Sequence, residues 1–124
     1  MTANDIVSLL NERVWTVSWL DFYIFSYEKN KLVIAGSDDF SYYHNVEIEC
    51  YNPIYMKGNF EWTCDTTGEL ASVGDAKKKL LFMNDDGIAL EVIADKFFIN
   101  FDTVFYYYRD NLIEGQRMAA WVKK

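Results

Sequence analysis

The chain is poor in the residues that bind metals or form disulfides. Its 124 residues include two cysteines, Cys50 and Cys64, and one histidine, His44. A structural zinc site needs four such ligands in closely spaced pairs, and these three residues do not form that pattern. Small secreted domains held by disulfides carry far more cysteine. We therefore expect no metal, and we expect both cysteines to be buried apolar groups, with His44 at the start of a strand.

Basic residues and long apolar runs are also scarce. The 12 Lys and Arg are outnumbered by 19 Asp and Glu, which gives a formal net charge of −7. Phosphate binding requires a basic surface, so this balance argues against a nucleic-acid partner. No apolar run approaches the roughly 20 residues of a membrane span, and the first ten residues lack the basic start of a signal peptide. We expect a cytoplasmic protein with no membrane association.

The sequence contains none of the common motifs of catalysis. It has no Gly-x-Ser-x-Gly nucleophile elbow, and Gly68 and Gly74, which are six residues apart, lack the directly following lysine that a P-loop requires. His44 is the single imidazole that could act as a base. The acidic pairs Asp38-Asp39 and Asp85-Asp86 lie where turns are expected, and turn aspartates usually bond their own backbone. We expect no cofactor and prefer a non-enzymatic function, although catalysis stays open.

The chain is rich in apolar and aromatic residues, which make up 51% and 18% of it. This content excludes intrinsic disorder, and a chain of this length buries roughly two-thirds of its surface when it folds. We therefore expect a single globular domain over residues 1–124.

The hydrophobic pattern predicts a mainly β (α+β) fold. Apolar residues between Ile6 and Val14 recur at helical spacing, and either Thr2 with Asp5 or Asn4 alone can cap the first turn. From Val14 onward the pattern alternates with a period of two, and helical spacing returns near the C-terminus. We expect a single antiparallel sheet, curled or packed on itself, with a short N-terminal helix and a short C-terminal helix. The expected strands are 15–27, 31–36, 45–52, 59–65, 79–84, 87–94, 96–101 and 103–109.

Turn residues predict how some of these strands connect. Residues 28–31 separate two apolar runs, and Asp86-Gly87 is typical of a tight hairpin that would place Met83 opposite Leu90. The last third then reads as an antiparallel meander, and residues 65–76 read as a loop. A hairpin between 46–51 and 60–65 would hold the sulfurs of Cys50 and Cys64 roughly 13 Å apart, too far for a disulfide.

Acidic residues alternate with apolar ones in two of the expected strands. Strand geometry places the acids on one face, and pairing of the two strands would gather them on one surface: Glu47, Glu49, Glu61 and Asp65. Like charges that face one another destabilise a sheet, so this face is a candidate for binding a basic partner. A solvated face that keeps the protein soluble explains the same pattern.

Aromatic residues are too numerous to point inward together. In 104–108 the alternation places Tyr106 and Tyr108 on one face and Tyr107 on the other. A core in which the tyrosine rings are buried and their hydroxyls reach solvent accounts for this pattern, as does an interface or an aromatic-lined pocket. The candidate pocket residues are Trp15, Trp19, Tyr42, His44, Tyr106 and Tyr108.

Two functions follow as hypotheses. The first is a protein-interaction module, of an inhibitor or adaptor kind, whose acidic and tyrosine-rich sheet face binds a basic protein surface. Small acidic β-rich bacterial domains, some immunity proteins among them, resemble the chain in type, although no motif supports the likeness. The second is a domain that binds or converts a small molecule in an aromatic cavity. Unpaired sheet edges and exposed aromatic residues would also suit a homodimer.

Overall fold

The computed structural model describes residues 2–13, 21–63, 71–73, 78–84 and 86–123. It shows a mainly β fold with one N-terminal helix, as expected, and no described helix is long and apolar enough to cross a membrane. The elements are α1 (Ala3–Arg13), β1 (Asp21–Glu28), β2 (Lys31–Ser37), β3 (Tyr43–His44), β4 (Val46–Tyr51), β5 (Tyr55–Gly58), β6 (Glu61–Thr63), β7 (Ala71–Val73), β8 (Lys79–Asn84), β9 (Gly87–Ile93), β10 (Lys96–Asn100), β11 (Thr103–Phe105) and β12 (Gln116–Met118).

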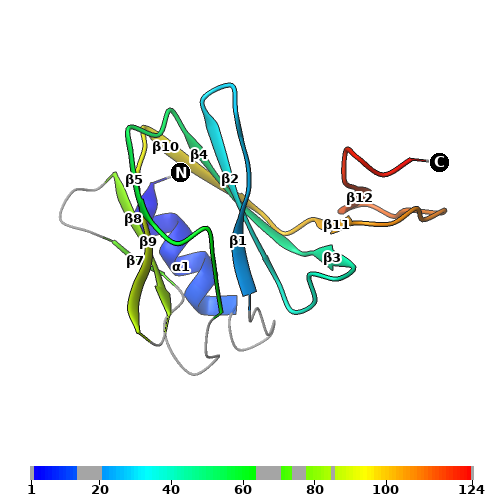
Figure 1. The fold of residues 1–124 in the computed structure, drawn as a ribbon, viewed down its shortest axis with the longest axis horizontal. Helices are drawn as coiled ribbons and strands as arrows, with labels where there is room; N and C mark the ends of the chain where they lie inside the picture. The colour runs from blue at the N-terminus through cyan, green and yellow to red at the C-terminus, as the bar shows by residue number, and fades with distance from the viewer. Residues whose placement is uncertain (1, 14–20, 64–70, 74–77, 85, 124) are drawn as a thin grey trace.

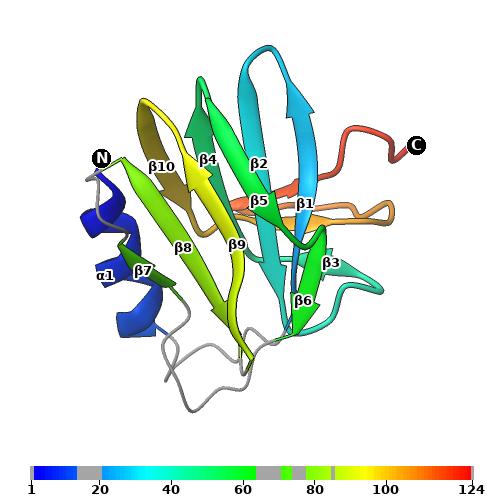
Figure 2. The ribbon, with the colours of Figure 1, turned by 60° about the vertical axis from the view of Figure 1, so that its left-hand side comes forward.

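The described strands form three sheets, which corrects the expectation of a single one. The largest has the order β10-β4-β2-β1-β6, the second β5-β9-β8-β7 and the smallest β12-β11-β3. The small sheet and the C-terminal segment extend to one side of the molecule (Figure 1). The five-stranded and four-stranded sheets face each other, with α1 beside β7 and β8 (Figure 2).

The core fills the space between the two larger sheets and α1. The five-stranded sheet buries one face by simple alternation, so that Ile48 and Cys50 point inward from β4 while the glutamates point outward. The four-stranded sheet contributes Leu80 and Val92 to the same cluster, and α1 contributes Ile6. We call the other side of the five-stranded sheet its outer face.

The helix begins with the predicted cap. The backbone N–H of Asp5 donates to the Thr2 hydroxyl at 3.3 Å, and the Thr2 N–H donates to the Asp5 carboxylate at 2.9 Å. This reciprocal pair satisfies two amides at the helix start. Ile6 and Leu10 then face the core, as predicted, while Val14 lies outside the described residues.

The β8–β9 hairpin has a different register from the predicted one. Asn84 pairs with Gly87, and an irregularity in the ladder places Phe82 opposite Leu90, where we had expected Met83. Gly87 therefore belongs to the paired strand β9, where we had expected it in the loop. Gly87 has a φ of 116°, which suits glycine at this turn.

The predicted meander is wrong, because β10 leaves β9 after two residues and pairs with β4 in the other sheet. The predicted hairpin of 46–51 with 60–65 is also wrong: β4 lies between β2 and β10, and β6 pairs with β1. Cys50 is a buried free thiol, and Cys64 lies outside the described residues.

Two further expectations need correction. Residues 71–73 form β7 within the stretch predicted to be a loop. The C-terminal region contains the short strand β12, parallel to β11, in place of a helix. Met118 supplies the last pair of that ladder, opposite Phe105, and Gly115 before it has a φ of 82° that a helix would not accommodate.

Candidate functional site

The register of the five-stranded sheet brings two of the predicted acidic residues into one row. Glu47 is opposite Ala35, Ala35 is opposite Tyr23, and Tyr23 is opposite Glu61. Glu49 lies two residues from Glu47 and therefore on the same outer face. The predicted common face thus includes Glu47, Glu49 and Glu61, while Asp65 lies outside the described residues.

We had predicted that Glu47 is exposed on that face. The structure shows that it is buried, with only 5% of its surface accessible. One carboxylate oxygen accepts a hydrogen bond from His44 Nε2 at 2.7 Å, and the other accepts from Asn100 at 3.2 Å and pairs with Arg117. Burial alone would raise the pKa of Glu47, but the hydrogen bonds from His44 and Asn100 and the charge of Arg117 outweigh it and lower the pKa. Glu47 is therefore a buried, ionised carboxylate whose charge is balanced by Arg117, and it has a structural role.

The other acids differ in their surroundings. Glu49 is half-buried and pairs with Lys31 Nζ at 3.3 Å. Glu61 is exposed on the edge strand β6, and Asp21 lies near it at the start of β1. Of the predicted partner-binding residues that the structure describes, Glu61 alone stays an open, solvent-facing carboxylate.

A chain of hydrogen bonds runs from Glu47 along the outer face. His44 is fully buried, and its Nδ1 lies 2.6 Å from the Tyr106 hydroxyl, which lies 2.7 Å from the Tyr23 hydroxyl. Because Glu47 is ionised, His44 Nε2 must carry the proton that it shares with the carboxylate. In neutral His44, Nδ1 then accepts from Tyr106, and Tyr106 accepts from Tyr23.

Burial raises the pKa of Tyr106, and the neighbouring Tyr23 and Glu47 raise it further. Burial also raises the pKa of Tyr23. Both hydroxyls therefore stay protonated at neutral pH and act as hydrogen-bond donors. They lack the lowered pKa that a base or nucleophile requires.

The predicted pocket residues are only partly brought together. His44 and Tyr106 are hydrogen-bonded partners, whereas Tyr42 and Tyr108 are exposed. Tyr108 bonds Asp110 close to it in the chain. Trp15 and Trp19 lie outside the described residues.

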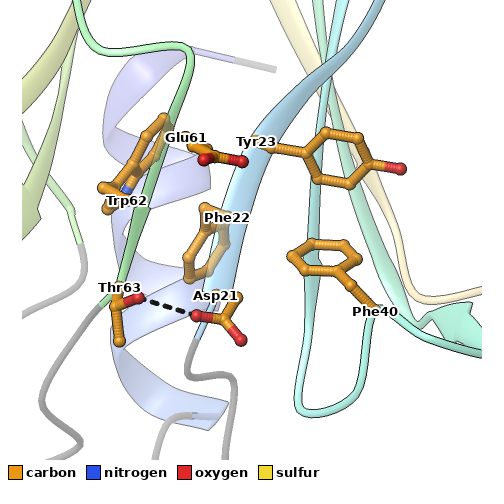
Figure 3. Close-up of a pocket in the computed structure, with 7 residues that line it drawn as sticks. All are labelled: Asp21, Phe22, Tyr23, Phe40, Glu61, Trp62 and Thr63. Atoms are coloured by element: carbon orange, nitrogen blue, oxygen red, sulfur yellow. Dashed lines mark hydrogen bonds between the residues drawn. The ribbon is translucent and has the colours of Figure 1, made fainter.

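A cavity of about 570 Å³ opens beside β1 and β6. The alternation of the two strands places Asp21 and Tyr23, with Thr63 and Glu61 opposite them, on the outer face. Figure 3 shows these side chains with Phe40, which comes from the segment after β2. The lining is Asp21, Phe22, Tyr23, Phe40, Glu61, Trp62 and Thr63. We call this cavity the acidic–aromatic cleft.

Two contacts order the side chains of the cleft. The Thr63 hydroxyl donates to Asp21 Oδ1 at 2.8 Å, and the other oxygen of this carboxylate accepts no hydrogen bond from the described residues. The rings of Tyr23 and Phe40 meet edge to face, with centroids 4.4 Å apart and planes at 85°. Phe22 and Trp62 stack on the core side, where the buried Trp62 indole N–H has no hydrogen-bond partner among the described residues.

The cleft carries negative charge that no described cation neutralises. Within the described ranges, the Lys and Arg side chains that form ion pairs do so with other acids, and none pairs with Asp21 or Glu61. A search of the same residues finds no group of three metal-ligating side chains. Carboxylates beside aromatic rings suit an organic cation, which gains from both.

Sequence reasoning missed Asp21, Phe40 and Thr63 as site residues. The alternation in 21–23 and 61–63 was a usable signal, because it places the acids and Tyr23 on one side of each segment. The missing step was the pairing of β1 with β6, which lie about 40 residues apart and carry no local turn signal.

Comparisons with known proteins add no external evidence for this site. The chain matches no family model, no curated protein and no solved structure. The case for its function therefore depends on the geometry of the acidic–aromatic cleft.

Proposed function

We propose that the protein is an interaction module that binds a basic partner by accepting a cationic side chain in the acidic–aromatic cleft. The observation that carries this proposal is the pair of carboxylates, Asp21 and Glu61, beside the rings of Tyr23 and Phe40, without a described cation between them. This is the use of an acidic, tyrosine-rich sheet face that the sequence led us to expect, with Asp21 in the place assigned to Glu47.

The charge of the whole molecule supports the same function. A net charge of −7 attracts basic surfaces, and a concave site concentrates the field of its own carboxylates. Tyrosine suits such a site because its ring contributes contact area with little conformational entropy to lose. An inhibitor or adaptor of a basic protein would need these properties.

The cleft also suits a second candidate, a small organic cation. Its volume of about 570 Å³ lies within the range of small-molecule sites. A catalytic role has weaker support. His44 between Glu47 and Tyr106 resembles an acid–base array, but His44 is fully buried and the pKa of Tyr106 is raised.

Fluorescence anisotropy with a labelled basic peptide of mixed Lys and Arg tests the proposal. Raising the salt from about 0.1 M to about 1 M shortens the screening length from about 10 Å to about 3 Å, so binding should weaken strongly. Changing Asp21→Asn and Glu61→Gln together should weaken it about tenfold, if each partly exposed charge contributes about 0.7 kcal/mol.

The matched control changes Glu28→Gln and Glu114→Gln, which are exposed acids outside the cleft. It removes the same net charge, so it should retain most of the affinity. Equal losses in both double variants would mean that the attraction is non-specific, and the proposed site would be wrong.

A further inference from the structure

The pairing of β1 with β6 fixes the relative positions of Asp21 and Glu61, the two acidic residues of the cleft. Asp21 is opposite Thr63, and Tyr23 is opposite Glu61, so Asp21 and Glu61 are diagonal neighbours on one face of an antiparallel pair. The backbones at diagonal positions in such a pair lie about 7–8 Å apart, and the two side chains extend from the same face. The Thr63 hydroxyl holds one oxygen of Asp21, which restricts the carboxylate to one side of the cleft.

This spacing distinguishes between the two common cationic side chains. A guanidinium group is planar and carries N–H donors on separate edges, so with two hydrogen bonds of about 2.9 Å it can bridge two carboxylates that extend side by side from diagonal positions. An ammonium group donates from a single nitrogen. Two bonds of the same length from one atom reach less far, so a lysine would contact one carboxylate at a time.

Tyr23 provides a ring that is held in place for stacking. Its hydroxyl is fixed through Tyr106 and the buried His44, and its ring meets the rings of Phe40 and Phe25 edge to face. In Figure 3 the Tyr23 ring lies above Phe40 and its hydroxyl is directed away from Glu61; because the two ring planes meet at 85°, Phe40 does not stack on the broad faces of the Tyr23 ring. Guanidinium groups stack on such faces more readily than ammonium groups do.

We propose that the acidic–aromatic cleft selects an arginine side chain over a lysine side chain, with the guanidinium group bridging Asp21 and Glu61 against the ring of Tyr23. This inference rests on the proposed function and specifies the chemistry of its ligand. Arginine-containing segments of a basic partner are then the ligands of the cleft.

The test is an NMR titration of the full chain with two blocked amino acids, N-acetyl-arginine amide and N-acetyl-lysine amide. Amide shifts of residues 21–23 and 61–63 report binding at the cleft. We expect the arginine compound to bind about fivefold more tightly, which corresponds to the upper end of an exposed cation–π contact, about 1 kcal/mol. Tetramethylammonium serves as a cation that cannot donate hydrogen bonds, and it should bind more weakly still.

Tyr23→Leu should reduce the preference for arginine about fivefold, because it removes the stacking ring. Tyr27→Leu is the matched control, since Tyr27 is exposed on the same strand outside the cleft. It should leave the preference unchanged. Far-UV circular dichroism and thermal unfolding verify that both variants fold. Tyr23→Phe retains the ring and should therefore retain the preference for arginine, and loss of the preference in that variant would contradict the stacking role.

The outcomes separate the two proposals. Equal affinity for arginine and lysine, lost on changing Asp21→Asn and Glu61→Gln, would refute arginine selection and leave the cationic cleft intact. Tighter binding of tetramethylammonium than of arginine would refute the bridging geometry. If none of the three compounds shifts residues 21–23 and 61–63, both the selectivity and the proposed function are wrong.

Discussion

Replacing the buried Glu47 by glutamine should lower the free energy of unfolding and should make that free energy depend less on pH in the acidic range. The carboxylate accepts from His44 and Asn100 and pairs with Arg117. An amide oxygen can still accept one of these bonds, but its charge is gone. A hydrogen bond to a charged group contributes about 1.5–3 kcal/mol, and breaking a fully buried ion pair costs about 3–5 kcal/mol.

Arg117 is 45% exposed and can regain water when its partner is lost, so the lower part of this range applies. We therefore expect Glu47→Gln to reduce the free energy of unfolding by about 2–3 kcal/mol at pH 7, measured by urea denaturation. Glu49→Gln is the control on the same strand. Its half-buried pair with Lys31 should contribute less than about 1 kcal/mol.

The pH dependence gives a second test of the same reasoning. The pKa of Glu47 is lowered from 4.5 in the folded state, so folding favours the charged form. Its contribution is fully present above about pH 4.5 and is lost as the pH falls through the folded-state pKa. The glutamine variant lacks this contribution at every pH, so the gap between the two proteins should narrow toward pH 3. A gap below about 0.5 kcal/mol at pH 7, or one that stays constant with pH, would refute this account.

Three other predictions test the structure elsewhere. Gly58→Ala should lower the free energy of unfolding by more than about 2 kcal/mol, because Gly58 has a φ of 139° and an added Cβ would lie 2.2 Å from a backbone oxygen. Gly87→Ala is the comparison, because an added Cβ there meets open space, and it should lower the free energy of unfolding by about 1 kcal/mol. Thermal unfolding measures both. In a Cys64→Ser background, Cys50 should resist a thiol reagent until the protein unfolds, because burial raises the pKa of its thiol; rapid labelling of the native protein would contradict this. Trp62→Phe should cost about 1 kcal/mol or less in urea denaturation, since losing an unpartnered N–H offsets part of the lost ring area, and a loss above about 3 kcal/mol would mean that the N–H has a partner.

Local patterns predicted the local structure well. The Thr2–Asp5 cap and the apolar spacing identified α1, and the turn at 28–31 correctly joined β1 to β2. The period of two identified the faces of β4 and β6. Each of these signals involves residues close in sequence, where geometry follows from the backbone alone.

The pairing of distant segments was not predictable in this way. β10 follows β9 after a short turn, yet it completes the sheet of β4, and nothing in 94–96 distinguishes this from a hairpin. The same limit explains the site. Alternation placed Glu47 on the correct face, but its burial depends on Arg117, which is 70 residues away in the chain.

The contact between Glu47 and Arg117 also has a consequence for folding during synthesis. Arg117 is synthesised 70 residues after Glu47, so until residue 117 leaves the ribosome Glu47 lacks the arginine that it pairs with in the folded protein. His44 and Asn100 emerge earlier than Arg117 and can satisfy part of the carboxylate in the meantime. The ion pair that completes the burial of Glu47 therefore forms late. In a nascent chain stalled before residue 117, Glu47 should be more solvated than in the folded protein.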